Sequence, residues 1–299
     1  MSATAAQSCG APAVYHRRQP ERTLLYRVVL TQLATWLALH DDGCGGHAPA
    51  LTEREFRRYL ECGILAHGFA RARCADCGHD FIIAYSCKGR GICPSCTTRR
   101  MVETAAHLVD HVFPRLPVRQ WVLSLPKRLR YHIDDANLQN AVLHSLLHGI
   151  EQGLRESLPT NGATHIDTYI GAVVFIHRFG SLLNAHLHFH VVMIDGVFCE
   201  EDAGRLHFLE TCLSAEQMAH LQRTIRQRIV RLFVRRGLLD KAEGQAMTTC
   251  EHDGGFSLDT HVRIEANDRQ GRERLLHYCA RPAFCPGTAA STRPGTSRL

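Results

Sequence analysis

Three histidines fall on alternate residues of an otherwise apolar run. His186, His188 and His190 alternate with Leu187 and Phe189, and the run continues as VVMI. Because successive side chains of a strand point to opposite faces, a strand here would place the three imidazoles on one face. A single strand histidine is usually a partly buried core residue. Three on one face would need three separate partners when neutral, and would repel one another when protonated.

A divalent cation would satisfy such a histidine face. His188 and His190 can together hold a cation and leave coordination positions open for a phosphate. His186 shares the face and is a possible further ligand. A zinc hydrolase using the three histidines is an alternative, but it needs a carboxylate base. Asp195 would reach the same strand face only if a bulge shifted the register.

Six of the thirteen cysteines crowd into 35 residues, namely Cys62, Cys74, Cys77, Cys87, Cys93 and Cys96. Two C-x-x-C pairs, at 74–77 and 93–96, are separated by fifteen residues, which is the spacing of a two-knuckle zinc site. Four thiolates close a tetrahedral structural site with no open position. We therefore expect Cys74, Cys77, Cys93 and Cys96 to bind structural Zn²⁺. Cys87 is a reserve ligand that, with Cys62, His67 or His79, could replace one of the four or help to hold a second ion.

Arginines surround the cysteines and also line a predicted helix at 214–236. The formal net charge is +6, which is mild evidence for a polyanionic partner. A basic surface of this kind is either a solvated face or a set of phosphate contacts. We favour nucleic acid, and expect DNA contacts from Arg90, Arg99, Arg100, Arg228 and Arg231.

The elements that position these residues follow from hydrophobic periodicity. It predicts helices at 21–40, 51–63, 97–113, 136–157 and 214–236, and a last helical turn or two within 272–284. The helix at 214–236 begins with a capping box formed by Ser214 and Gln217. Strands are predicted at 118–126, 164–180, 186–198 and 261–266, with a short turn at 181–184 joining the second to the third.

This mixture predicts an α+β fold in two parts. We expect a small helical zinc-binding domain at 21–113 and a catalytic domain at 114–284, between disordered tails at 1–20 and 285–299. No apolar stretch approaches the ~20 residues of a membrane span, and the N-terminus lacks the order of a signal peptide. Clustered thiols in a chain of this size also favour metal binding over disulfides. We therefore expect a cytoplasmic protein without a membrane partner.

Several stretches together resemble a known family. They are CADCGHDFIIAYSCKGRGICPSC, RQWVLSLP, FIHRFGSLLNAHLHFHVVMIDGVF and LLHYCARPAF, in that order along residues from about 20 to 284. The HFH at 188–190 is similar to the His-hydrophobic-His (HUH) motif of rolling-circle single-strand nucleases. The whole chain resembles the rolling-circle insertion-sequence transposases that carry an N-terminal zinc domain.

The resemblance implies a HUH-type nuclease domain with a central, mainly antiparallel sheet flanked by helices. It implies that Tyr278 attacks a phosphodiester of single-stranded DNA at the ends of a mobile element, giving a 5′-phosphotyrosine and a free 3′-hydroxyl. His188 and His190 would hold the catalytic Mg²⁺ or Mn²⁺. Arg274 stands where some relatives have a second tyrosine, so a single-tyrosine enzyme is expected.

The family normally continues beyond the ARP segment at 280–282, where this chain becomes rich in Pro, Gly, Ser and Thr. We therefore expect a C-terminally truncated catalytic domain, a truncation that can impair activity. The alternative function is that of a non-catalytic, zinc-containing DNA-binding remnant of such a transposase.

Overall fold

The computed structural model describes residues 18–40, 50–75, 77–89, 91–133, 135–158, 168–180, 184–201, 205–250 and 253–282. The chain divides into two compact units, residues 1–97 and 98–299. Within the described ranges no helix has the length and apolar character needed to span a bilayer. The predicted tails fall almost entirely outside these ranges, as does most of the predicted turn at 181–184. The predicted domain boundaries stay predictions.

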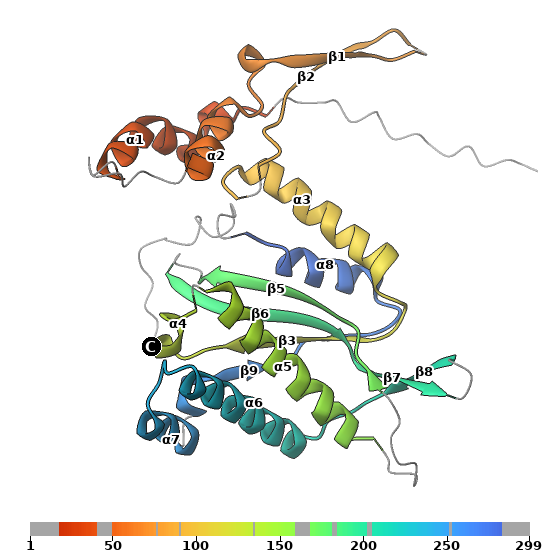
Figure 1. Cartoon of the computed structure of the whole chain (residues 1–299). Helices are drawn as coiled ribbons and strands as arrows, with labels where there is room; N and C mark the ends of the chain where they lie inside the picture. Colours follow the sequence, from red (N-terminus) through yellow and green to blue (C-terminus); the bar gives the residue numbers. More distant parts are fainter. Residues whose placement is uncertain are drawn as a thin grey trace, which may run out of the picture. The chain divides into compact units, whose positions relative to one another are not determined.

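The first unit contains two helices, a β-hairpin and the start of a third helix (Figure 1). These are α1 (Leu24–His40), α2 (Ala50–Glu61), β1 (Phe69–Arg73), β2 (Asp80–Ala84) and α3 (Pro94–His107), with short 3₁₀ turns at Pro20–Arg22 and Leu65–His67. Val29 and Leu33 of α1 and Tyr59 of α2 form a small buried core together with cysteine side chains. A core of this size gives limited stability by itself.

The second unit is built on an antiparallel sheet with the strand order β10-β3-β6-β5, in which β9 also pairs with β3. Its strands are β3 (Val118–Ser124), β5 (Ala172–Phe179), β6 (Ala185–Ile194), β9 (Ser257–Asp259) and β10 (Arg263–Ile264). A second antiparallel sheet joins β4 (Thr168–Tyr169), β7 (Gly196–Glu201) and β8 (Arg205–Glu210). The predicted α+β class with a mainly antiparallel sheet is confirmed.

The single strand predicted at 186–198 is in fact two strands that belong to different sheets. β6 ends at Ile194 and β7 begins at Gly196, opposite Glu210 of β8. A Cβ atom at Gly196 would lie 2.3 Å from the carbonyl oxygen of Leu209. Only glycine permits this close approach of the two backbones, so the chain can change sheets at this point.

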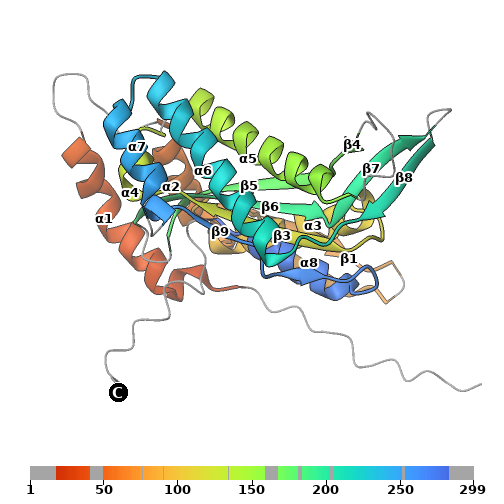
Figure 2. The same ribbon diagram turned by 90° about the horizontal axis from the view of Figure 1, so that it is seen from below.

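Helices cover both faces of the main sheet (Figures 1 and 2). On one face lie α5 (Ala136–Glu156), α6 (Ala215–Arg235) and α7 (Lys241–Thr249); on the other lies α8 (Arg269–Cys279), beside the end of α3 and its π-helical continuation Leu108–Val112. Short helices occupy Lys127–Arg130 (α4) and Asp253–Gly255. The predicted capping box of Ser214 and Gln217 is present at the start of α6.

The two faces of β6 have different neighbours. Leu187, Phe189 and Val191 enter the core shared with α5 and α6. Val192 and Ile194 enter the core shared with α8. By strand alternation His188 and His190 therefore face α8, and the prediction that the histidines of this run share one face is confirmed by their adjacent rings.

Candidate metal centres and nucleophile

Three imidazoles form the candidate cation site, and one of them comes from a neighbouring strand. His177 of β5 lies directly opposite His188 of β6 in the sheet register. One nitrogen from each of His177, His188 and His190 lies within 4.8 Å of the others. The ring centroid of His177 is 5.2 Å from that of His188 and 4.5 Å from that of His190. Facing side chains of paired strands are expected to meet in this way.

Backbone carbonyls fix the tautomers of two of these histidines. Nε2 of His177 donates to the carbonyl oxygen of Cys279, at 2.7 Å, and Nδ1 of His188 donates to that of His186, at 2.8 Å. Because a carbonyl can only accept, the lone pairs are on Nδ1 of His177 and Nε2 of His188. Such second hydrogen bonds commonly orient metal-ligating histidines.

His190 is the most buried of the three and has a side-chain partner, Gln120 of β3. The Gln120 amide nitrogen lies 2.8 Å from Nδ1 of His190, and Nε2 of His190 is buried without a hydrogen-bond partner. Burial, followed by the charges of His177 and His188, lowers the pKa of His190 to about 3. Burial is also the first cause that lowers the pKa of His177. Neutral imidazoles with an unpartnered nitrogen are the form that binds a cation.

His186 stands beside this group rather than in it. Its ring centroid is 4.9 Å from that of His188, but the three nitrogens that converge belong to the other histidines. Its Nε2 is buried and unpartnered, and burial followed by the charge of Arg130 lowers its pKa. Sequence reasoning missed His177, although it lies in the strand predicted next to the histidine run.

Tyr278 lies next to the histidine group. It is on the last turn of α8, with its ring centroid 5.8 Å from that of His190. The guanidinium carbon of Arg281 lies 5.1 Å from the Tyr278 ring centroid. The side chain is 47% exposed, so a polymer can reach the phenol. The structure thus brings Tyr278, His188 and His190 together, as expected, and adds His177.

Asp195 does not face this site as a free carboxylate. It is buried, and both oxygens accept from arginines: Arg119 donates two hydrogen bonds of 2.8 Å and Arg263 donates one of 2.6 Å. Both carboxylate oxygens are therefore already occupied by guanidinium donors. The alternative of a zinc hydrolase with Asp195 as its base therefore loses support.

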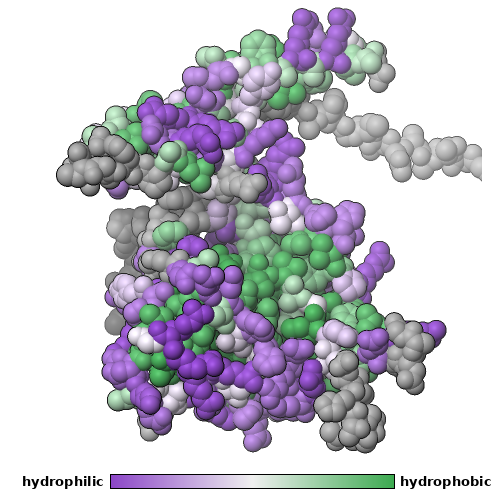
Figure 3. Space-filling model, viewed as in Figure 1, coloured by the Kyte–Doolittle hydropathy of each residue, from purple (hydrophilic) through white to green (hydrophobic). Residues whose placement is uncertain are grey.

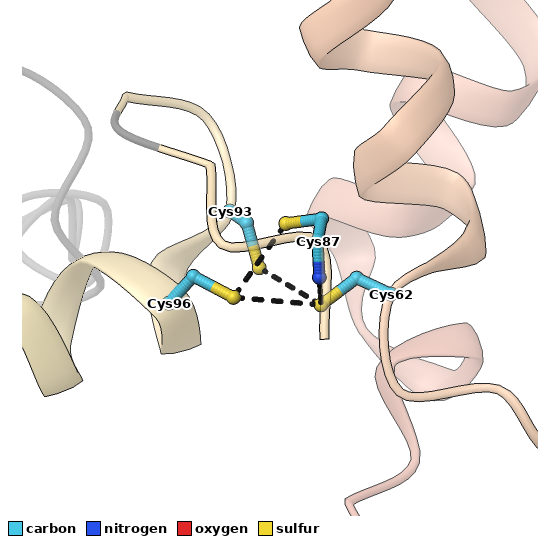
Figure 4. A group of neighbouring side chains, drawn as sticks. All are labelled: Cys62, Cys87, Cys93 and Cys96. Carbon is cyan, nitrogen blue, oxygen red and sulfur yellow. Dashed lines mark hydrogen bonds between the residues drawn. The ribbon is translucent and has the colours of Figure 1, made fainter. Parts of the chain in front are cut away.

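The structure brings together a cysteine set that differs from the predicted one. The sulfurs of Cys62, Cys87, Cys93 and Cys96 lie within 4.8 Å of one another (Figure 4). The sulfur–sulfur distances from Cys62 to Cys96, from Cys87 to Cys96 and from Cys93 to Cys62 are 3.5–3.6 Å. A tetrahedron with Zn–S bonds of about 2.3 Å has edges of about 3.8 Å, so these residues fit a Zn²⁺ ion.

Cys74 and Cys77 lie outside this group of four, contrary to the two-knuckle prediction. They flank the turn between β1 and β2, where the amide of Gly78 donates to the carbonyl oxygen of Cys74. Strands β1 and β2 pair from Phe69 opposite Ala84 to Arg73 opposite Asp80. The turn is therefore at one end of the hairpin, and Cys87, which follows β2, is at the other. Cys87, a reserve ligand by sequence, takes a place in the group with Cys62.

The pKa values of the four thiols shift in opposite directions: those of Cys62 and Cys87 are raised, and those of Cys93 and Cys96 are lowered. Hydrogen bonds from Cys62 and then Cys87 lower the pKa of Cys93 to about 7, and Cys62 is also the first cause that lowers the pKa of Cys96. The amide of Cys87 donates to the sulfur of Cys62, and that of Gly89 to the sulfur of Cys87. Amide donors to sulfur stabilise thiolates, which are the ligands that Zn²⁺ requires.

The predicted DNA-contacting arginines fall into two places, with Arg90 outside the described residues. Arg99 and Arg100 are exposed on α3, where Arg99 pairs with Glu103. Arg228 and Arg231 line a groove of about 1050 Å³ between α5, α6 and α7. The groove also carries Arg235, Lys241, His144 and His148, and its lining contains no carboxylate. The surface over these helices is mainly hydrophilic in Figure 3.

Two family models match the chain. Residues 34–125 match the transposase zinc-binding domain of the IS91 type, and residues 171–293 match a domain described as putative transposase. The first range contains all four clustered cysteines, and the second contains the three histidines and Tyr278. No curated protein and no solved structure matches the chain.

Proposed function

Because the chain belongs to the transposases that combine a zinc-binding domain with a putative transposase domain, we propose that it cuts and rejoins single-stranded DNA with Tyr278 as the nucleophile. The observation that carries this proposal is the position of Tyr278 beside a group of three histidines whose ring nitrogens converge. A tyrosine next to a cation site is suited to attack a phosphodiester rather than to fill a core.

In the proposed step the phenol oxygen of Tyr278 attacks phosphorus, and the bond from phosphorus to the 3′ oxygen breaks. The phenol proton leaves, and the departing 3′ oxygen takes up a proton. The product is a 5′-phosphotyrosine with a free 3′-hydroxyl, and attack by a 3′-hydroxyl reverses the step. A bound divalent cation would polarise the phosphate. His177, His188 and His190 would hold it.

The donor set favours one of the two predicted cations. Mg²⁺ prefers oxygen ligands and near-ideal octahedral geometry, whereas imidazole nitrogen is a good ligand for first-row transition metals. We propose Mn²⁺ rather than Mg²⁺ as the better fit to three histidines. To leave Nε2 of His190 free for the cation, the Gln120 amide would present its oxygen to Nδ1.

The zinc-binding domain would act as a scaffold for DNA contacts. We propose Cys62, Cys87, Cys93 and Cys96 as the ligands of its structural Zn²⁺. We further propose that Arg99 and Arg100 on α3, with Arg228 and Arg231 in the groove, contact phosphates without reading bases. The groove lining supports this, because it gathers cationic side chains without a carboxylate.

The test incubates the full chain with single-stranded DNA from the ends of such an element and with Mn²⁺, then separates protein under denaturing conditions. We expect a covalent protein–DNA adduct in the wild type and none in Tyr278→Phe. Tyr131→Phe is the matched control, since Tyr131 is exposed and outside the histidine group. An adduct in Tyr278→Phe would reject the nucleophile. No adduct in any variant, with DNA binding intact, would favour the binding remnant.

A further inference from the structure

Arg272, at the end of the first turn of α8, is a buried guanidinium without an acidic partner in the described part of the chain. It is 4% exposed. Its Nη1 donates to the carbonyl oxygen of Pro114 at 2.8 Å, and its Nε is buried without a hydrogen-bond partner. Among the described residues no carboxylate forms an ion pair with it; the nearby Asp110 instead pairs with Arg269, at 2.8 Å.

This arrangement is unfavourable unless an anion completes it. Burying a charged group without a counter-charge opposes folding, and a guanidinium does not escape the cost by losing its proton. One hydrogen bond to a carbonyl satisfies one of its five donors. A buried arginine that lacks an acidic partner, and whose Nε has no hydrogen-bond partner, therefore points to a ligand that carries negative charge and several acceptor oxygens.

Arg272 also lines a cavity that can admit such a ligand. The cavity has a volume of about 600 Å³ and lies between the end of the π-helical segment and the start of α8. Arg115, Arg269 and Asn267 line it as well, and Asp110 is its single acidic lining residue. Arg269 pairs with Asp110 and also with Glu273, so it is Arg115 and Arg272 that leave the cavity cationic.

We propose that this cavity binds a phosphate of the DNA strand, as a second anchor on the helix that carries Tyr278. The identity of the ligand as DNA rests on the proposed function; the anion site itself rests on Arg272 and the cavity. Arg272 and Tyr278 are six residues apart, which is roughly 9 Å along the axis of α8. A phosphate held at the start of this helix would fix the strand relative to the phenol at its end.

The test compares the full-length wild type with Arg272→Met and with Arg274→Met. Methionine keeps much of the length of arginine and removes its charge. Arg274 is the matched control, because it is on the same helix but is 71% exposed and outside the cavity lining. Each protein is unfolded in urea with and without inorganic phosphate, and titrated with a short single-stranded oligonucleotide at several salt concentrations.

We expect Arg272→Met to be at least as stable as the wild type without phosphate, since a buried unpaired charge is gone. Phosphate should raise the urea midpoint of the wild type and of Arg274→Met, but not that of Arg272→Met. The affinity of Arg272→Met for the oligonucleotide should fall roughly tenfold. The slope of log K against log salt should become shallower by about 0.7, as for one lost phosphate contact.

Three results would overturn the proposal. A destabilised Arg272→Met that binds the oligonucleotide like the wild type would make Arg272 a structural residue. If phosphate stabilises the wild type but not Arg272→Met, and the two proteins bind the oligonucleotide equally well, the cavity binds free anions and the assignment to DNA is rejected. If Arg272→Met does not fold, Arg115→Gln decides, because Arg115 is an exposed residue of the same cavity; an unchanged salt slope would reject the site. None of these readouts needs cleavage, so a failure of the proposed nuclease activity is recognised separately.

Discussion

The rings of His190 and Tyr278 form a T-shaped contact, with centroids 5.8 Å apart and planes inclined by 80°. His190 comes from the centre of the sheet and Tyr278 from the end of α8, 88 residues later by their numbers. The contact places a buried, neutral nitrogen base close to a half-exposed phenol. A nucleophile and a cation site must be adjacent for the chemistry we propose.

The third histidine of the site should prove to be His177 and not His186. We expect His177→Ala to lose Mn²⁺ binding to the same extent as His188→Ala and His190→Ala, because all three offer nitrogens to one point. His186→Ala should cost little. Titration calorimetry with Mn²⁺ measures this without cleavage. Equal losses in His186→Ala and His177→Ala would contradict the ligand set.

The cysteine variants should divide into two classes. Cys62→Ser and Cys87→Ser should lower the zinc content and the solubility as strongly as Cys93→Ser, because metal binding contributes to folding a domain with a small core. Cys74→Ser and its neighbour Cys77→Ser should keep the zinc stoichiometry of the wild type. Elemental analysis of each purified variant measures its zinc content. A loss of zinc in Cys74→Ser or Cys77→Ser would support the two-knuckle ligand set instead.

Without the catalytic cation, stability should fall as the pH is lowered. The folded-state pKa of His190, about 3, lies below the ordinary value near 6.5. Between these values the unfolded chain binds more protons than the native one, so stability is present above pH 6.5 and is lost as the pH falls toward 3. The slope is at most about 1.4 kcal/mol per pH unit for this group.

Urea unfolding of the wild type and of His190→Gln between pH 7.5 and 5 isolates that contribution. The zinc site and the other titrating groups are common to both proteins. We expect the wild type to lose more stability than the variant over this range. Parallel pH profiles would mean that His190 is not held neutral by burial.

Gln120 should control how tightly the cation binds. Gln120→Glu offers only acceptor oxygens to Nδ1 of His190, which places the proton there and frees Nε2, so Mn²⁺ affinity should rise. Gln120→Leu removes the partner, and affinity should fall by about 10–100-fold. Thermal unfolding of the metal-free proteins serves as the control for packing. A Gln120→Leu protein with wild-type affinity would exclude a positioning role.

Much of the architecture could be predicted because local signals decided it. Helix α6 was predicted from its apolar stripe and capping box, and the alternating faces of β6 followed from period two. The short helix α7 and strands β8 and β9 were missed. Their sequences carry weak periodicity, and they form because they pack against or pair with elements that are distant in sequence.

The residues of the site were predictable only as far as one strand or one motif reached. His188 and His190 belong to a single strand, whereas the position of His177 depends on the register of β5 against β6. The local sequence pattern does not determine that register. The spacing of cysteines favoured Cys74 and Cys77 because two knuckles suffice for a zinc site. The hairpin β1–β2 carries that pair away and leaves Cys62 and Cys87 at its base.

A hydrogen bond from Nε2 of His177 to the carbonyl oxygen of Cys279 joins the proposed cation site to the residue next to Tyr278. Coupling free energy is reciprocal. If cation binding at His177 stabilises the end of α8, then a stabilised helix end must increase the affinity of the site for the cation by the same free energy. A substitution or ligand that contacts neither the histidines nor Tyr278, but changes the stability of this helix end, would therefore change the fraction of protein that holds the cation. The enzyme would be loaded most readily when its nucleophile is already in place.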